Sequence, residues 1–171
     1  MFELRDLPNY ETLAEFAQRY GNQDIDGLQT WLILASATSE MLSAFERNLA
    51  RDGLSQTQFF VLLLLKRNPG GLSVGTLADG VAVTSQTMTR VLDRMEAAGM
   101  CTKLANPGDR RAWIIQLASV GEELLSTALP SHYEWVTRLM SRFDAKERES
   151  LQKLMMKLNG PSALSPEPGA G

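Results

Sequence analysis

The pattern of apolar and polar positions near the start of the chain predicts a short amphipathic helix. Asn9 can cap its start and Gly21 can end it, because asparagine favours the capping position and glycine favours the left-handed conformation after the last turn. Its apolar side chains recur at the i, i+3, i+4 and i+7 spacing of one helix face: Leu13, Phe16, Ala17 and Tyr20. Such a face needs a surface to pack on, so residues 1–23 are interpreted as an N-terminal helical arm.

A much longer helix is predicted to follow, from about Gly27 to Asp52. Apolar residues recur in it every seven positions: Leu28, Ala35, Leu42 and Leu49. Three larger apolar residues lie between them: Trp31, Leu32 and Phe45. Since a helix of this length suits packing between subunits, residues 24–53 are predicted to be a dimerisation helix.

A short helix, a tight turn and a second helix are predicted in the middle of the chain. The segment from Ser73 to Gly80 opens with a capping residue, and Thr84 caps the following helix, which Gly99 ends. The apolar residues of this second helix form one buried stripe: Met88, Val91, Leu92 and Met95. Its polar residues are left on the outer face: Ser85, Gln86, Thr87, Thr89, Arg90, Asp93 and Arg94.

Two further signals frame this pair of helices. Before it, Ser55 and Gln58 have the spacing of a capping box and start a largely apolar helix that stops at Pro69-Gly70-Gly71. After it, the runs MCTKLA and AWIIQL flank the turn residues Pro107-Gly108 and predict a β-hairpin. Residues 54–118 thus have the element order of a winged helix-turn-helix DNA-binding lobe. The predicted fold class is mainly α with a small β-hairpin wing, its winged helix-turn-helix core flanked by long dimerisation helices.

The C-terminal part of the chain predicts two more helices. Ser119 is expected to cap a long one, and Pro130 is expected to kink or break it, because proline removes a backbone hydrogen bond. Asp144 and Glu147 form a capping box for the last helix. Its apolar stripe consists of Leu151, Leu154, Met155 and Leu158. Residues 119–158 are therefore predicted to be C-terminal dimerisation helices, and 159–171, rich in Gly, Pro and Ser, a disordered tail.

Charge supports this picture only locally. The chain has 171 residues, 44% of them hydrophobic, and 17 Lys and Arg against 20 Asp and Glu give a net charge of −3. The whole molecule therefore offers no electrostatic reason to bind a polyanion. From Thr84 to Arg111, however, five basic residues oppose three acidic ones, which leaves a local charge of +2. Ser, Gln and Thr near a helix N-terminus can hydrogen bond to base edges, and arginines can reach phosphates, so this region predicts DNA binding.

Three stretches of the chain resemble the MarR family of winged helix-turn-helix transcriptional regulators: LSQTQFFVLLLL, LADGVAVTSQTMTRVLDRMEAAGM and NPGDRRAWIIQLASVGEELL. The resemblance covers about Leu54 to Leu125. It rests on a combination of positions: Gln58, Leu77-Ala78, Thr89-Arg90, Asp93-Arg94, Gly99, Pro107 and Asp109-Arg110-Arg111. Ser119 stands where family members usually carry Thr. The arm before Asp24 is shared by only some members, so its task stays open.

The resemblance implies a homodimer that places two recognition helices in successive major grooves of a pseudo-palindromic double-stranded DNA operator. It implies a repressor that a small aromatic or phenolic effector releases. The implied base or sugar-phosphate contacts are Ser85, Gln86, Thr87 and Thr89. The implied phosphate and wing contacts are Arg90, Arg94, Arg110 and Arg111. Asp109 is expected to pair with Arg111 and brace the wing, and Asp93 to tie the recognition helix to a wing arginine.

Two other classes of function are compatible with parts of the sequence. A winged-helix module can bind protein instead of DNA, although its recognition face is then expected to be apolar. The stretch Gly71-Leu72-Ser73-Val74-Gly75 matches the G-x-S-x-G motif of serine hydrolases, with His132 later in the chain. That motif needs a preceding strand, whereas a helix is predicted there, so the chain is not expected to be an enzyme.

The remaining candidate residues give no strong signal. Cys101 is the single cysteine, and it is either a small buried hydrophobic residue or a redox sensor. His132 lacks neighbours at metal-ligand spacing, so neither a metal nor another cofactor is expected. Trp31, Phe45 and Phe59 either line an effector pocket or belong to the core. No signal-peptide pattern or membrane-length apolar run is found, which favours the cytoplasm.

Overall fold

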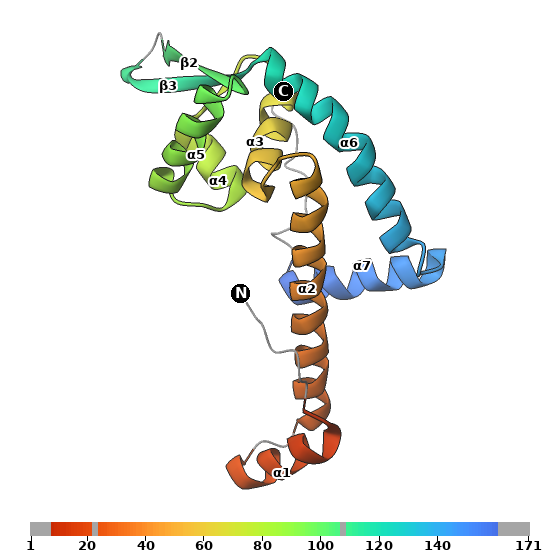
Figure 1. Cartoon of the computed structure of the whole chain (residues 1–171). Coiled ribbons are helices and arrows are strands. Elements are labelled where there is room, and N and C mark those ends of the chain that lie inside the picture. Colours follow the sequence, from red (N-terminus) through yellow and green to blue (C-terminus); the bar gives the residue numbers. More distant parts are fainter. Residues whose placement is uncertain (1–7, 22–23, 107–108, 161–171) are drawn as a thin grey trace. The chain divides into compact units, whose positions relative to one another are not determined.

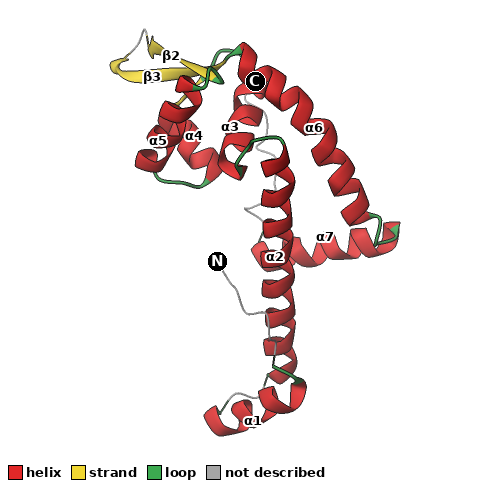
Figure 2. Ribbon diagram, viewed as in Figure 1, coloured by secondary structure: helices red, strands yellow, loops and turns green. Residues whose placement is uncertain are grey.

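The computed structural model of the chain describes residues 8–21, 24–106 and 109–160, and within these ranges no side chain is described for residues 106, 109–112 and 159. The chain divides into two compact units, Met1–Ala128 and Leu129–Gly171. Most described residues are helical (Figures 1 and 2). The helices are α1 (Tyr10–Tyr20), α2 (Ile25–Arg51), α3 (Gln56–Arg67), α4 (Val74–Val81), α5 (Ser85–Ala97), α6 (Ser119–Met140) and α7 (Ala145–Asn159). The strands are β1 (Leu72–Ser73), β2 (Cys101–Asn106) and β3 (Asp109–Leu117). The predicted fold class is confirmed.

The N-terminal arm forms the predicted helix α1, which packs on α2. Asn9 Oδ1 accepts a hydrogen bond from Thr12 N (2.9 Å), and Gly21 adopts the left-handed conformation after the last turn. Leu13 and Ala17 are buried. The other two members of the predicted face, Phe16 and Tyr20, are exposed, so the chain covers only half of that face.

Helix α3 provides the centre of the first unit. Its predicted capping box is present. The Ser55 hydroxyl accepts a hydrogen bond from the backbone N of Gln58 (3.3 Å), and Gln58 Oε1 accepts one from Ser55 N (2.9 Å). The apolar run of α3 buries four side chains completely or almost so: Phe59, Val61, Leu62 and Leu65. Phe45 of α2 contacts the rings of Phe59 and Phe60 with centroids 5.9 and 5.7 Å apart. These contacts join the long helix α2 to α3.

The helix-turn-helix consists of α4 and α5, as predicted. Ser73 and Thr84 cap the two helices, and the turn between them passes through Ala82, which has φ of 56°. Met88, Leu92 and Met95 are fully buried, and Val91 is half-buried. Because this stripe occupies one side of α5, the orientation of the helix is fixed by its own apolar spacing.

The sheet has three strands in the order β1-β3-β2, where a two-stranded hairpin was predicted. β1 has only two residues, Leu72 and Ser73, which pair with Ile115 and Ile114 of β3. Gly71 precedes β1 with φ of 86°, and a Cβ there would lie 2.5 Å from Ile114 Cγ2. A two-residue strand is too short to produce an alternating pattern, which is why the sequence did not predict it.

Helix α6 differs from the prediction at its start. It begins at Ser119 itself, and Glu122 N donates to Ala118 O, so Ala118 and not Ser119 occupies the cap position. Pro130 lies inside α6 and the helix is not broken there. The boundary between the two compact units nevertheless falls close by, after Ala128.

The second unit contains the rest of α6 and the predicted helix α7. The capping box of Asp144 and Glu147 is confirmed, with hydrogen bonds of 2.8 and 2.9 Å. Arg148 Nη1 donates to the carbonyl oxygens of Met140 (3.2 Å) and Phe143 (3.0 Å), which fixes the turn between the helices. The apolar stripe of α7 is largely uncovered, since Leu154 and Leu158 are exposed. Residues 161–171 of the predicted tail lie outside the described residues.

Two glycines give a matched test of the packing at the start of α6 and of α4. A Cβ on Gly121 would lie 2.2 Å from Met100 O, so Gly121→Ala is expected to lower the free energy of unfolding by about 1–3 kcal/mol. A Cβ on Gly75 would meet only Ser73 Oγ, at 3.8 Å, so Gly75→Ala is expected to raise it by about 0.5 kcal/mol. Urea denaturation followed by circular dichroism measures both. Equal effects in the two variants would contradict the packing described for Gly121.

Candidate nucleic-acid interface

The outer face of α5 is exposed along its whole length. Because Met88, Leu92 and Met95 are buried, the opposite side of the helix faces solvent. Every polar residue predicted to lie there is exposed: Ser85, Gln86, Thr87, Thr89, Arg90, Asp93 and Arg94. The structure therefore collects the predicted recognition-helix residues on one continuous surface.

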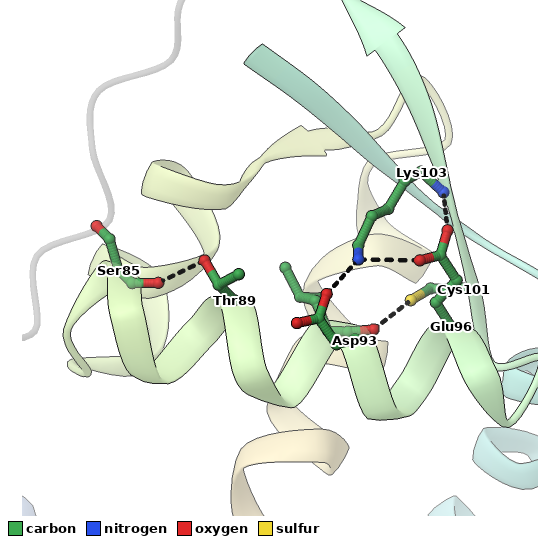
Figure 3. Close-up of polar contacts among 7 residues, drawn as sticks. Ser85, Thr89, Asp93, Glu96, Cys101 and Lys103 are labelled. Atoms are coloured by element: carbon green, nitrogen blue, oxygen red, sulfur yellow. Dashed lines mark hydrogen bonds and ion pairs between the residues drawn. The ribbon is translucent and has the colours of Figure 1, made fainter. Parts of the chain in front are cut away.

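Hydrogen bonds within the first turns of α5 determine which of these groups remain available. Thr84 Oγ1 accepts from Thr87 N (3.2 Å) and donates to Thr87 Oγ1 (2.9 Å). Figure 3 shows the bond that Thr89 Oγ1 donates to Ser85 O at 2.9 Å. The Gln86 amide makes no hydrogen bond within the described part of the chain. Gln86 therefore keeps both a donor and an acceptor for an external partner, which is the combination that a bidentate contact with adenine requires.

A lysine of the sheet forms ion pairs with both carboxylates of α5. Lys103 of β2 places Nζ 2.5 Å from Asp93 Oδ1 and 2.9 Å from Glu96 Oε2, and its backbone N donates to Glu96 Oε1 at 3.3 Å (Figure 3). The Lys103 side chain is only 16% exposed. Its hydrogen bonds to Asp93 and then to Glu96 raise the pKa of the Lys103 ammonium above its usual value. The Lys103 ammonium therefore stays protonated at neutral pH.

The arginines of α5 have no comparable partner. Within the described residues neither Arg90 nor Arg94 makes an ion pair, and both are exposed. Since Lys103 already engages Asp93 and Glu96, these carboxylates are not the partners of the arginines. The exposed face of α5 consequently presents positive charge in a chain whose net charge is negative.

Within the described residues, Asp93 has a partner that was not predicted, Lys103. The predicted contact with a wing arginine stays a prediction, because those arginine side chains are not described. No local sequence signal marks Lys103, since it lies ten residues from Asp93 and the hairpin brings it to α5. The side chains of Asp109, Arg110 and Arg111 lie outside the described residues, and β3 is described there by its backbone alone.

Cys101 is a neutral core residue at the start of β2. It is almost fully buried, with Sγ 4.0 Å from Leu92 O. Burial is the main cause that raises the pKa of its thiol to about 11; nearby Glu96 adds to the increase and Lys103 opposes it. Because a reactive cysteine needs a thiolate and solvent access, this environment favours a structural role over redox sensing.

Ser73 is held as a helix cap. Its hydroxyl accepts from Thr76 N (3.1 Å) and lies 2.8 Å from Thr76 Oγ1. Ser73 is itself the second residue of strand β1, whereas the sequence predicted only a helix before the serine. Nevertheless the hydroxyl is used in α4, and in the described residues no strand-helix series of the hydrolase kind surrounds it.

The described chain offers little support for other sites. Phe45 and Phe59 belong to the core, and Trp31 is more than half exposed. A surface pocket of about 580 Å³ lies where α2 meets α3 and is lined by Glu46, Ala50, Gly53, Leu54, Ser55, Gln56 and Thr57. His132 stacks on Trp135, and burial lowers the pKa of its imidazole. Among the residues described, no group of three or more His, Cys, Asp or Glu side chains is placed to hold a metal ion. The described helices include none of the length and apolarity that a membrane span requires.

Comparisons with known proteins agree on one kind of relative. The model of the MarR family matches residues 54–113. The HTH-type transcriptional repressor YetL of Bacillus subtilis (strain 168) is 30% identical over 154 residues, which cover 90% of this chain and 92% of YetL. The HTH-type transcriptional regulator PecS of Dickeya dadantii (strain 3937) is 26% identical, over 87% of this chain and 93% of PecS.

Solved structures give the same result. The transcriptional repressor CouR bound to a 23-mer DNA duplex is 27% identical and aligns with a TM-score of 0.63, over 75% of this chain and 90% of CouR. AbsC, a MarR family transcriptional regulator from Streptomyces coelicolor, is 19% identical with a TM-score of 0.70 over 76% of this chain and 89% of AbsC, which shows the shared fold. These relatives are transcriptional regulators and not enzymes.

Removing the bridging lysine tests its part in this interface. Lys103→Met breaks the connection between α5 and β2 and leaves Asp93 and Glu96 uncompensated on a surface that would face phosphates. We expect its affinity for duplex DNA, measured by fluorescence anisotropy, to fall about fivefold or more, which corresponds to about 1 kcal/mol. Because both carboxylates are exposed, the loss of folding stability should stay below about 1 kcal/mol.

Lys66→Met is the matched control for this variant. It removes the same charge from an exposed ion pair with Glu122, which joins α3 to α6 away from the face of α5. Its DNA affinity should stay within about twofold of the unmodified protein. If the two variants lose affinity equally, the effect reflects total charge and not the bridge.

Proposed function

Since this chain belongs to the MarR family of winged helix-turn-helix transcriptional regulators, we propose that it binds a specific DNA operator and represses transcription from it. The observation that carries the proposal is the exposed face of α5, on which Gln86 keeps its hydrogen-bonding groups free and Arg90 and Arg94 lack ion pairs within the described chain. That face fits α5 as the helix that enters the major groove. A helix adapted to bind protein would instead present an apolar face.

Individual residues have distinct roles in this proposal. Base edges and adjoining sugars are contacted by Ser85, Gln86, Thr87 and Thr89. Phosphates are contacted by Arg90 and Arg94, and the wing reaches DNA through Arg110 and Arg111. Asp109 braces the wing tip. Asp93 acts indirectly, because its bridge to Lys103 holds α5 against the sheet that carries the wing.

We further propose that the working form is a homodimer. The long helix α2 leaves several large apolar side chains exposed in the single chain: Trp31, Ile33, Met41 and Leu42. Helix α7 does the same with Leu154, Met156 and Leu158. Burying such faces against a second copy removes apolar surface from water, and a two-fold dimer binds a pseudo-palindromic operator.

A small aromatic or phenolic effector is proposed to release the repressor from DNA. This part rests on the resemblance to the family. The pocket where α2 meets α3 supports it, because it lies where the proposed dimerisation helix joins the DNA-binding lobe. Action in the cytoplasm is proposed with this function, because the proposed partner is operator DNA.

The DNA-reading role of α5 is tested with a duplex that the protein itself selects from a random pool. Gln86→Ala should weaken binding to this duplex by about 1–3 kcal/mol and leave binding to unrelated DNA nearly unchanged. Gln152→Ala removes the same amide from the exposed surface of α7 and serves as the control. Equal losses on both duplexes for Gln86→Ala would refute base contact.

Arg90→Ala should weaken binding to the selected duplex and to unrelated DNA alike, and it should lower the salt dependence of binding by about one unit of log-log slope.

The assembly is tested by light scattering at micromolar concentration. The expected mass is twice the 18.9 kDa of one chain. Replacing Met41 and Leu42 of α2 by Lys should shift the mass towards one chain, since charges then occupy the exposed apolar face. A single-chain mass for the unmodified protein would exclude the proposed dimer.

A further inference from the structure

The wing carries a large aromatic side chain that the rest of the described chain leaves uncovered. Trp113 lies in β3 opposite Ala105 of β2 and is 51% exposed. Its indole makes neither a ring contact nor a hydrogen bond within the described residues. An indole group has a broad apolar face together with one N–H donor, so half of its surface in water is costly unless a partner covers it.

The register of the hairpin shows which face Trp113 occupies. Lys103 pairs with Ile115 and Ala105 pairs with Trp113, so these side chains share one face of the two strands. Ile115 is fully buried on that face, and Lys103 reaches Asp93 of α5 from it. Trp113 therefore lies on the face that turns towards α5, two residue pairs closer to the wing tip than Lys103.

The opposite face of the hairpin offers a natural comparison. Leu104 pairs with Ile114 there, and Leu104 is 46% exposed, nearly as much as Trp113. The two side chains thus differ in face and not in exposure. Trp113 thus shares its face of the hairpin with Lys103, which contacts Asp93 of α5, whereas Leu104 lies on the other face.

We propose that Trp113 packs against the sugar-phosphate backbone of duplex DNA, where a strand passes between α5 and the wing. The proposal rests on the proposed DNA-binding function. The apolar face of the indole covers a deoxyribose, and Nε1–H donates to a phosphate oxygen. Charge complementarity supports DNA as the occupant, because Arg90 and Arg94 present unpaired positive charge on the neighbouring helix. Trp113 thereby fixes the angle at which the wing meets the duplex, without reading the base sequence.

The test uses the fluorescence of Trp113 in the full-length chain. The chain has three tryptophans, so Trp31→Phe together with Trp135→Phe leaves Trp113 as the single reporter. The probe is a duplex that the protein has selected from a random pool. Adding this duplex should change the Trp113 emission and reduce its quenching by acrylamide about twofold or more, because contact with DNA removes the exposed half of the ring from solvent.

Substitutions then measure how much the Trp113 side chain contributes to the affinity for DNA. Trp113→Ala should weaken binding of the selected duplex about fivefold to thirtyfold, equivalent to about 1–2 kcal/mol. Leu104→Ala, on the other face of the same hairpin, should change it less than about twofold. Trp113→Phe retains a ring without the N–H donor and should lie between the two. Circular dichroism verifies that each variant is folded, and the fluorescence measurement does not depend on any substitution at Trp113.

Each outcome is informative. If the duplex binds and acrylamide still reaches Trp113 as before, the inference is wrong while the proposed function stands. If Trp113 becomes protected at higher protein concentration without DNA, its partner is a second protein chain and the inference is also wrong. If the protein selects no duplex at all, the proposed function fails and this inference fails with it.

Discussion

The buried stripe of α5 is the constraint on which the candidate interface depends. Met88, Leu92 and Met95 are fully buried, so the opposite side of the helix faces solvent. The elements around it form the surface that receives this stripe. Helices α3 and α4 and strand β2 all pack against α5. One apolar stripe therefore determines both where the helix is attached and which side chains it displays.

The charge on the exposed face of α5 depends on local ion pairs and not on the net charge of the chain. The chain is acidic, and α5 itself carries Asp93 and Glu96. A single lysine in β2 engages both carboxylates, so the arginines of α5 are left to define the sign of the exposed face. The same contact attaches the helix to the sheet. Lys103 therefore contributes both to the position of α5 and to the charge that a polyanion would meet on its exposed face.

Most of the local structure could be predicted from the sequence because it depends on neighbours in the chain. Caps such as Ser55 and Asp144 bond to backbone groups three residues away, and their helices begin where predicted. Ser119 was placed one residue wrongly, because Ala118 supplies the first helical carbonyl. At Pro130, where a kink or a break was predicted, α6 continues, so the break does not occur. These errors concern boundaries and leave the order of elements unchanged.

What the sequence could not show depends on pairing between distant strands. Lys103 meets Asp93 only through the register of β2 and β3, and no local pattern marks a two-residue strand such as β1. The exposed outer face of α5 was predictable from helical spacing, whereas the bridge that supports it was not. The residues proposed to read DNA could thus be predicted from helical spacing, whereas Lys103, which holds their helix to the sheet, depends on strand pairing.

The pairing of β1 with β3 also constrains how the protein folds. Leu72 and Ile115 are neighbours in the sheet, although α4, α5 and β2 lie between them in the chain. The recognition helix is therefore enclosed in a loop that closes only when β3 joins β1. Contacts of such sequence separation form late and slowly compared with helical turns. Formation of the lobe is consequently cooperative: α5 gains its final environment in the same step that completes the wing.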